Sequence, residues 1–264
     1  MSNVKKFQKN HTVQLDFFIF SVLKELRPKY RIFLFGLLWT LGQPLLSSFV
    51  VTFIFRNKLS NFVIQQNYFF FCFAGLSIWT FFSNAINQAG SIFQNRVKLI
   101  KSSSNNRLLI TLAPITALFL ELLFSLYFAL FVFELLSLLS FKPLMLIGVF
   151  LAALLVFIFT ASSVLLISVI SLEFRDLRYL IPFFVQLFFL TAPVIYEAPL
   201  EGFLGSLYHS SPLALSMSIY RWTLGLQTFP SPTQFMTGVV MALFWAFACG
   251  LFFHLKSKKL AEFL

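Results

Sequence analysis

The chain has 264 residues, of which 59% are apolar and 11% are charged, and its formal net charge is +11. A soluble domain of this length carries about 25% charged residues, so the composition excludes a soluble globular protein and indicates an integral membrane protein. The apolar runs are too long for the strands of a membrane barrel, so the predicted membrane spans are helices.

The first predicted element is a helix over residues 16–27, within a cytoplasmic segment that covers residues 1–30. The sequence DFFIFSVLKELR places apolar side chains at helical spacing and charged side chains on the other side. Asp16 near its start and Pro28 just after its end mark the expected bounds. We expect an amphipathic helix in the cytoplasmic interface of the membrane, with packing on a soluble partner as the alternative.

Six membrane-spanning helices are predicted between residues 31 and 255. Most of these apolar runs reach or exceed the length that a helix needs to cross the hydrocarbon core. The fifth is the shortest and carries Pro182 and Pro193. The expected fold is an all-α integral membrane protein, in which residues 1–264 form one transmembrane domain that ends in a cytoplasmic tail, residues 256–264. The predicted spans are 31–55, 68–89, 108–139, 144–172, 179–196 and 235–255.

The segment between the fifth and sixth spans, residues 197–233, is not predicted to cross the membrane. About half of it is apolar, but prolines and glycines interrupt it too often for a continuous helix to cross the membrane. An ordinary surface loop would not carry so many large apolar side chains. We therefore expect short re-entrant helices on the outer side of the membrane.

The positive charges set the orientation of the chain. Of its 20 Lys and Arg residues, all fall in segments on one predicted side of the membrane except Arg56, Lys58, Lys142 and Arg221. The positive-inside rule therefore places both termini in the cytoplasm. Contact with anionic membrane lipid also accounts for the net positive charge, so no nucleic acid partner is expected.

Several kinds of chemistry are absent from the sequence. No phosphate-binding loop of the form G-x-x-x-x-G-K-[ST] occurs, so the chain itself should not hydrolyse ATP. Cys72 and Cys249 lie in apolar runs, which predicts two buried free thiols. The three histidines lie far apart, so no metal site is expected. The few clustered carboxylates fall in pairs on opposite sides of the membrane, which disfavours an enzyme.

Polar side chains inside the predicted spans mark a candidate translocation path. Asn84, Asn87, Gln88 and Ser91 lie three and four residues apart, so they share one helical face. In lipid such a face turns toward protein or water, and hydrogen bonding between helices is the alternative. Glu121 is the carboxylate expected at depth. It either lines a polar path or is neutral and bonded to a neighbour.

Two aromatic residues join this candidate path. Tyr196 ends the fifth predicted span, and Trp222 lies in the outer segment that follows. Sugars stack on aromatic faces, so both side chains could contact a glycan. An interfacial belt of Tyr and Trp is the alternative explanation.

Three stretches of the sequence resemble one known family. Residues 23–55, LKELRPKYRIFLFGLLWTLGQPLLSSFVVTFIF, resemble its interface helix and first span. Residues 175–196, RDLRYLIPFFVQLFFLTAPVIY, resemble its fifth span, and residues 211–225, SPLALSMSIYRWTLG, resemble its outer re-entrant segment. The chain thus resembles the membrane subunit of polysaccharide, O-antigen and teichoic-acid exporters, a branch of the second type of ABC export permease.

The resemblance implies a working assembly of two copies of this chain and two copies of a separate ABC ATPase. ATP and Mg²⁺ would bind the ATPase, and this chain would hold no cofactor. ATP binding would move the membrane halves apart, and a lipid-linked glycan on a polyprenyl diphosphate would pass outward across a bacterial inner membrane. The alternatives are export of a drug or another lipid by the same architecture, or a membrane enzyme acting on lipid-linked sugars.

The resemblance also assigns roles to three cytoplasmic segments. Plain anchoring by positive charge is the alternative for the second and third of them. The loop after the second span would dock on the ATPase, although Ser102 to Asn106 replace the family's aromatic-proline core. The candidates there are Arg96, Lys98, Lys101 and Arg107. The hairpin before the fifth span would be a second coupling contact, with candidates Glu173, Arg175, Asp176 and Arg178. A lipid diphosphate would enter where cations meet the interface, near Arg27, Lys29, Tyr30 and Arg31.

Overall fold

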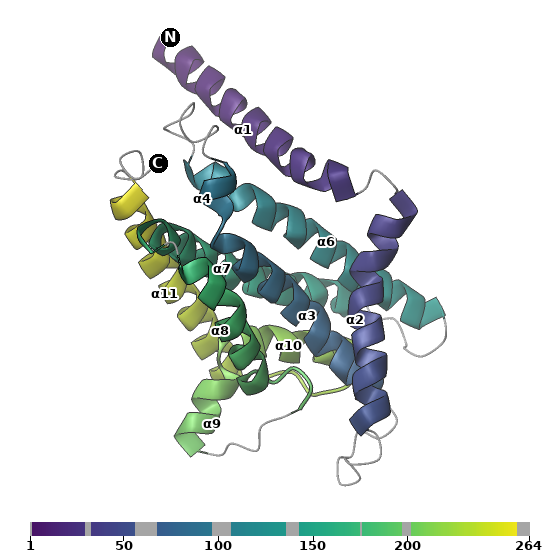
Figure 1. Ribbon diagram of the computed structural model, residues 1–264. Coiled ribbons are helices and arrows are strands. Elements are labelled where there is room, and N and C mark those ends of the chain that lie inside the picture. Colours follow the sequence, from purple (N-terminus) through teal and green to yellow (C-terminus); the bar gives the residue numbers. More distant parts are fainter. Residues whose placement is uncertain are drawn as a thin grey trace.

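The computed structural model describes residues 2–29, 33–55, 68–96, 107–135, 143–174, 176–196 and 202–257. Within these ranges every regular element is a helix, which confirms the all-α fold class (Figure 1). The helices are α1 (Ser2–Lys29), α2 (Phe33–Phe55), α3 (Tyr68–Ala89), α4 (Ile92–Asn95), α6 (Arg107–Leu135), α7 (Pro143–Glu173), α8 (Leu177–Thr191), α9 (Gly202–His209), α10 (Pro212–Thr223) and α11 (Pro232–Ser257).

Four of these helices, α3, α6, α7 and α11, are long and apolar enough to cross a bilayer. Two shorter apolar helices accompany them, α8 and the stretch Trp39–Phe55 of α2. Together they coincide with the six predicted spans. The fifth ends earlier than predicted, at Thr191, because Ala192 takes an extended conformation before Pro193, as residues that precede proline favour. The chain is therefore a multi-pass membrane protein, and the count of six crossings stays a prediction.

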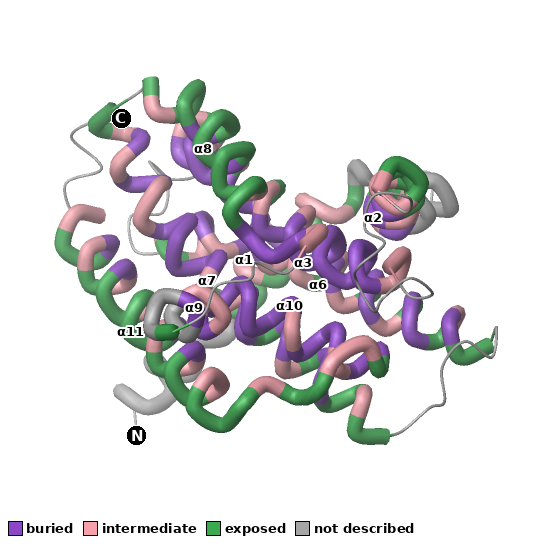
Figure 2. Tube along the Cα trace, turned by 90° about the horizontal axis from the view of Figure 1, so that it is seen from below, coloured by how far each residue is buried: buried purple, intermediate pink, exposed green. Residues whose placement is uncertain are grey.

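The core of the molecule lies around α3 and α7. Helix α7 packs against α3, α6, α10 and α11, and buried residues cover much of α3, α7 and α10 (Figure 2). Gly148 of α7 allows a close approach, because a Cβ there would lie 2.4 Å from Thr223 Cγ2 on α10. Cys72 and Cys249 are buried and free, as predicted.

Helix α1 extends beyond its predicted bounds at both ends. It begins at Ser2 rather than near Asp16, and Pro28 lies within its last turn rather than after it. The apolar periodicity that predicted the helix covers the stretch that packs on α6. The polar residues before Asp16 continue the helix without such a pattern, so apolar spacing could not reveal them.

The apolar side chains of α1 divide between two surroundings. Val22 is buried against Ala113 and Ala117 of α6, and Phe18 and Leu26 pack beside it. Ile19 and Leu23, in contrast, stay exposed. A helix with one apolar strip on the protein and another left open suits the membrane interface.

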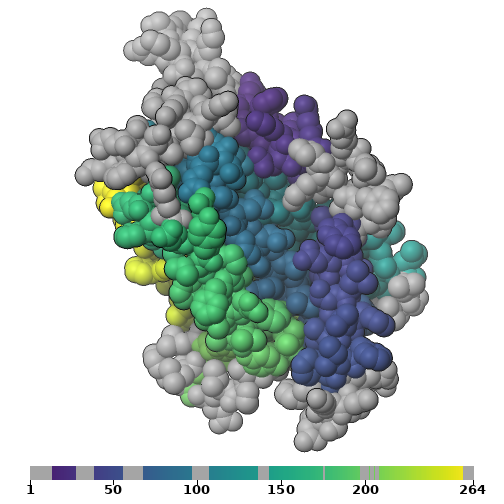
Figure 3. Space-filling view, viewed as in Figure 1, coloured from purple at the N-terminus to yellow at the C-terminus, as the bar shows by residue number. Residues whose placement is uncertain are grey.

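The helices place the charged segments at one end of the bundle. Helices α1 and α4 and the end of α11 lie together at the top of Figure 1, and α9 lies at the opposite end. Along the face in Figure 3, α3 lies between α8 and α2, and it packs against both.

Candidate functional site

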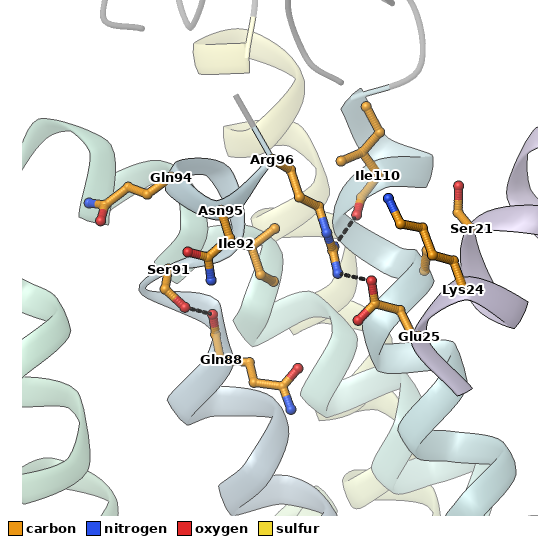
Figure 4. A pocket seen from close by; sticks show the side chains of 11 residues that line it. Ser21, Lys24, Glu25, Gln88, Ser91, Ile92, Gln94, Asn95, Arg96 and Ile110 are labelled. Atoms are coloured by element: carbon orange, nitrogen blue, oxygen red, sulfur yellow. Dashed lines mark hydrogen bonds and ion pairs between the residues drawn. The ribbon is translucent and has the colours of Figure 1, made fainter. Parts of the chain in front are cut away.

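A pocket of about 970 Å³, with several polar residues in its lining, lies beside α1 and α4 (Figure 4). Helix α1 contributes Lys24 and Glu25, the end of α3 contributes Gln88, and the turn and helix that follow contribute Ser91 and Asn95. The start of α6 closes the pocket. The predicted interface helix and the predicted coupling segment therefore face each other across this pocket.

Arg96 joins three elements at this pocket. Its Nη2 donates to Glu25 Oε1 at 2.6 Å, and its Nη1 donates to the carbonyl of Ile110 in α6 at 2.9 Å. The two partners of the ion pair are only partly exposed, 16% for Arg96 and 36% for Glu25. A predicted coupling residue thus holds the interface helix against α6.

Replacing Glu25 with Gln should loosen this contact. The change keeps the side-chain shape and removes the charge, so the free energy of unfolding should fall by about 1 kcal/mol, the upper range of partly exposed pairs. The measurement is the midpoint of thermal unfolding in detergent. Glu134→Gln, at an exposed position near the end of α6, is the matched control and should leave the midpoint unchanged. An equal midpoint for both variants would contradict a structural role for the pair.

The other predicted coupling residues of this loop are partly described. Arg107 begins α6, and its Nη1 donates to the carbonyl of Ser257 at the end of α11. Lys98 and Lys101 lie outside the described residues. The predicted coupling loop is therefore flanked in the sequence by two arginines, Arg96 and Arg107, that each contact another helix.

The hairpin between α7 and α8 contacts two neighbouring elements. Glu173 pairs with Lys256 of α11 at 2.8 Å. Arg178 Nη1 donates to Gln94 Oε1 of α4 at 2.6 Å, and Asp176, in the N-cap position of α8, is exposed and makes no capping bond. Arg175 lies outside the described residues. The Arg178–Gln94 bond joins the two segments that were predicted separately as ATPase contacts.

Little of the predicted entrance for a lipid diphosphate is described. Arg27 is exposed near the end of α1, and the backbone of Lys29 ends that helix. Tyr30 and Arg31 lie outside the described residues. Lys24, which the sequence did not single out, lines the pocket one helical turn before Arg27.

The four residues predicted to share one helical face do not all lie on α3, because the helix ends at Ala89 and Ser91 lies in the turn that follows. Gln88 and Ser91 line the pocket, whereas Asn84 and Asn87 lie on the surface and are the exposed residues of an otherwise buried or half-buried helix. Asn87 Nδ2 donates to Ser83 Oγ at 3.3 Å. Two amides therefore reach the surface from the most buried helix of the bundle.

The three remaining candidate residues of the translocation path do not belong to α3. Glu121 is half-buried on α6. Tyr196 donates its hydroxyl to the carbonyl of Leu190, and Trp222 contacts Phe229 edge to face with ring centroids 5.0 Å apart. Tyr196 therefore contacts the end of α8, and Trp222 contacts another residue of the outer segment.

Arg221 lies in the core, although charge counting places it among the outer loop cations. Its side chain is 1% exposed, and its Nη2 donates to the carbonyls of Pro193 and Val194, both at 2.8 Å. The guanidinium carbon lies 3.5 Å from the ring centroid of Phe71. A buried hydrogen bond to a charged group contributes about 1.5–3 kcal/mol. The sequence placed Arg221 in the outer segment and did not predict its burial.

The fold defines a multi-pass α-helical membrane protein. Its charged segments near α1, α4 and the end of α11 lie together at one end of the helix bundle. No family model matches the chain. It is similar to the O-antigen export system permease protein RfbA of Klebsiella pneumoniae in two versions, with 27% identity over 195 residues and 28% over 199 residues, each match covering 73% of both chains. It is also similar to RfbA of Myxococcus xanthus, with 26% identity over 238 residues, 85% of this chain and 87% of the relative. These similarities confirm the predicted resemblance to the membrane subunits of O-antigen exporters, and all three relatives are named as permeases.

Proposed function

We propose that the chain is the membrane-spanning subunit of an ATP-driven ABC exporter for a lipid-linked polysaccharide of the O-antigen, capsule or teichoic-acid type. The observation that carries this proposal is the similarity to three O-antigen export permeases over most of the chain, in a protein with several helices able to span a membrane. The sequence has no phosphate-binding loop, so a separate ATPase would supply the energy.

In this proposal both termini lie in the cytoplasm. The charged residues that the positive-inside rule assigns to the cytoplasm are those near α1, α4 and the end of α11, which the fold gathers at one end. The ATPase would contact this end through the loop after α4 and the α7–α8 hairpin. The Arg178–Gln94 bond would let the two contacts move together.

Asn84 and Asn87 support a translocation path beside α3. Amide side chains are unfavourable against lipid, so an exposed pair on a buried helix favours water or protein at this surface. A second copy of the chain that faced the surface between α2 and α8 would shield both amides and enclose a polar path. The lipid-linked glycan would pass along it.

Replacing Asn84 and Asn87 together with Leu should test this path. We expect export to fall by about tenfold while the amount of protein in the membrane stays the same, because the lining loses both amides. The measurement is glycan on the cell surface. The pair Asn84→Gln and Asn87→Gln keeps the amides and should retain most of the export. If the face met lipid, the leucine variant would export normally.

Deletion of the gene tests the proposed function itself. In a cell that makes the glycan, the lipid-linked form should accumulate on the cytoplasmic side and surface glycan should disappear, and a plasmid copy of the gene should restore it. Unchanged surface glycan with altered drug resistance would instead support a drug exporter.

A further inference from the structure

The backbone just after α8 is held by side chains from three other helices. The carbonyl of Thr191 accepts the hydroxyl of Tyr208 at 2.6 Å, and the carbonyl of Ile195 accepts the hydroxyl of Tyr68 at 2.8 Å. Arg221 donates to the two carbonyls between them, those of Pro193 and Val194. We call Tyr68, Tyr208 and Arg221 the outer anchor. It binds the last residue of α8 and the non-helical segment that follows it to α3, α9 and α10.

This anchor is tightly packed. Ala192, Pro193 and Val194 are buried, as is the arginine that binds them. A Cβ at Gly75 of α3 would lie 2.2 Å from the oxygen of Val194 and 3.0 Å from Arg221 Nη2, so only glycine allows this approach. Non-helical backbone buried in a membrane protein needs such donors, because no water replaces them.

The other end of α8 has fewer polar contacts to other helices among the described residues. Its described polar contact to another helix is the exposed Arg178–Gln94 bond, and Asp176 makes no capping bond. Between the two ends only Ile181 and Val185 of α8 are buried. A Cβ at Gly90, in the turn after α3, would lie 2.8 Å from Ile181 Cδ1 and 3.1 Å from Arg178 Cα, so this end is held by packing. The outer end of α8 is therefore fixed by buried hydrogen bonds, whereas the cytoplasmic end is held by packing and one exposed hydrogen bond.

We propose that Arg221 is a positioning residue that makes the outer end of α8 a fixed pivot. Force applied at the α7–α8 hairpin then swings the cytoplasmic end of α8 while its outer end stays on α3 and α10. Trp79 of α3 and Gly90, in the turn after α3, contact α8, and Asn87 lies on α3 three residues before Gly90. The swing would change the width of the path beside Asn87. This inference rests on the proposed function.

Spin-label distances in the wild-type complex test the pivot directly. The complex of this chain with the ATPase subunit, in lipid nanodiscs, carries one label pair at Leu180 and Leu255 and another at Leu190 and Phe229. All four side chains are exposed. On ATP binding the cytoplasmic pair should change its distance and the outer pair should not. An outer pair that moves as much as the cytoplasmic pair would overturn the proposal.

Variants of the anchor add a functional test. Arg221→Met and Gly75→Ala should lower the amount of glycan exported per ATP hydrolysed by about tenfold, since each disturbs the charged hydrogen bonds of the anchor. Arg221→Lys, which keeps a cation and donors, should recover part of the loss. Gly250→Ala is the control, because a Cβ there meets nothing within 4 Å. A merely structural role would reduce export and hydrolysis equally and leave this ratio unchanged, which would overturn the proposal.

These experiments separate the pivot from the proposed function. A complex that hydrolyses ATP and exports glycan, yet shows a mobile outer pair, refutes the pivot alone. A chain that neither binds the ATPase nor changes its rate refutes the exporter and the pivot with it. If Arg221→Met does not accumulate in the membrane, the wild-type distances and Gly75→Ala still decide the question.

Discussion

Reversing two charges of the α7–α8 hairpin, Arg175→Glu with Asp176→Lys, should stop export and leave the protein in the membrane. The number of basic residues on each side stays the same, so the positive-inside rule keeps the topology. If the hairpin docks on the ATPase, each reversed residue would face a like charge on the partner instead of an opposite one. Such like-charge contacts cost several kcal/mol. Export should therefore fall by more than about tenfold.

The measurement pairs surface glycan with the amount of protein in the membrane fraction. Glu134→Lys, a charge reversal near the end of α6, is the control and should leave export unchanged. Loss of the double variant from the membrane would make the hairpin a folding or topology element. Normal export would remove its coupling role.

Replacing Gly148 with Val should destabilise the packing of α10 on α7. The first added carbon alone would lie 2.4 Å from Thr223 Cγ2 and 2.9 Å from Trp222 Cζ3, and both residues belong to the closely packed end of α10. Overpacking of this kind costs about 1–3 kcal/mol, so the midpoint of thermal unfolding in detergent should fall by several degrees.

Gly250→Ala supplies the comparison, because the space around Gly250 is open. Its midpoint should stay equal to that of the wild type or rise slightly, since alanine favours a helix more than glycine does. Equal midpoints for Gly148→Val and the wild type would contradict this prediction. They would show that α10 can shift away from α7 without loss of stability.

The apolar helices could be predicted well from the sequence, because length and hydropathy decide where a helix can cross a membrane. The second predicted span has the bounds of α3, Tyr68–Ala89. The fifth ends before Pro193 because of a local backbone effect, and α1 begins at Ser2 because helix formation there needs no apolar pattern.

The candidate site could be predicted only in part. Helical spacing identified the face that carries Asn84 and Asn87, and a charge cluster identified the hairpin that carries Asp176 and Arg178. The contacts that join distant segments, such as Arg96 with Glu25, depend on tertiary packing and leave no local pattern. Burial of Arg221 is of the same kind, because its partners are backbone carbonyls that have no signature in the sequence.

The most direct test of the exporter proposal is purification of the chain together with the ATPase subunit of the same system, followed by an ATP hydrolysis assay in lipid. The proposal predicts a complex with two copies of each chain, and a hydrolysis rate that differs from that of the isolated ATPase. A chain that purifies alone, forms no complex and leaves the hydrolysis rate unchanged would contradict it.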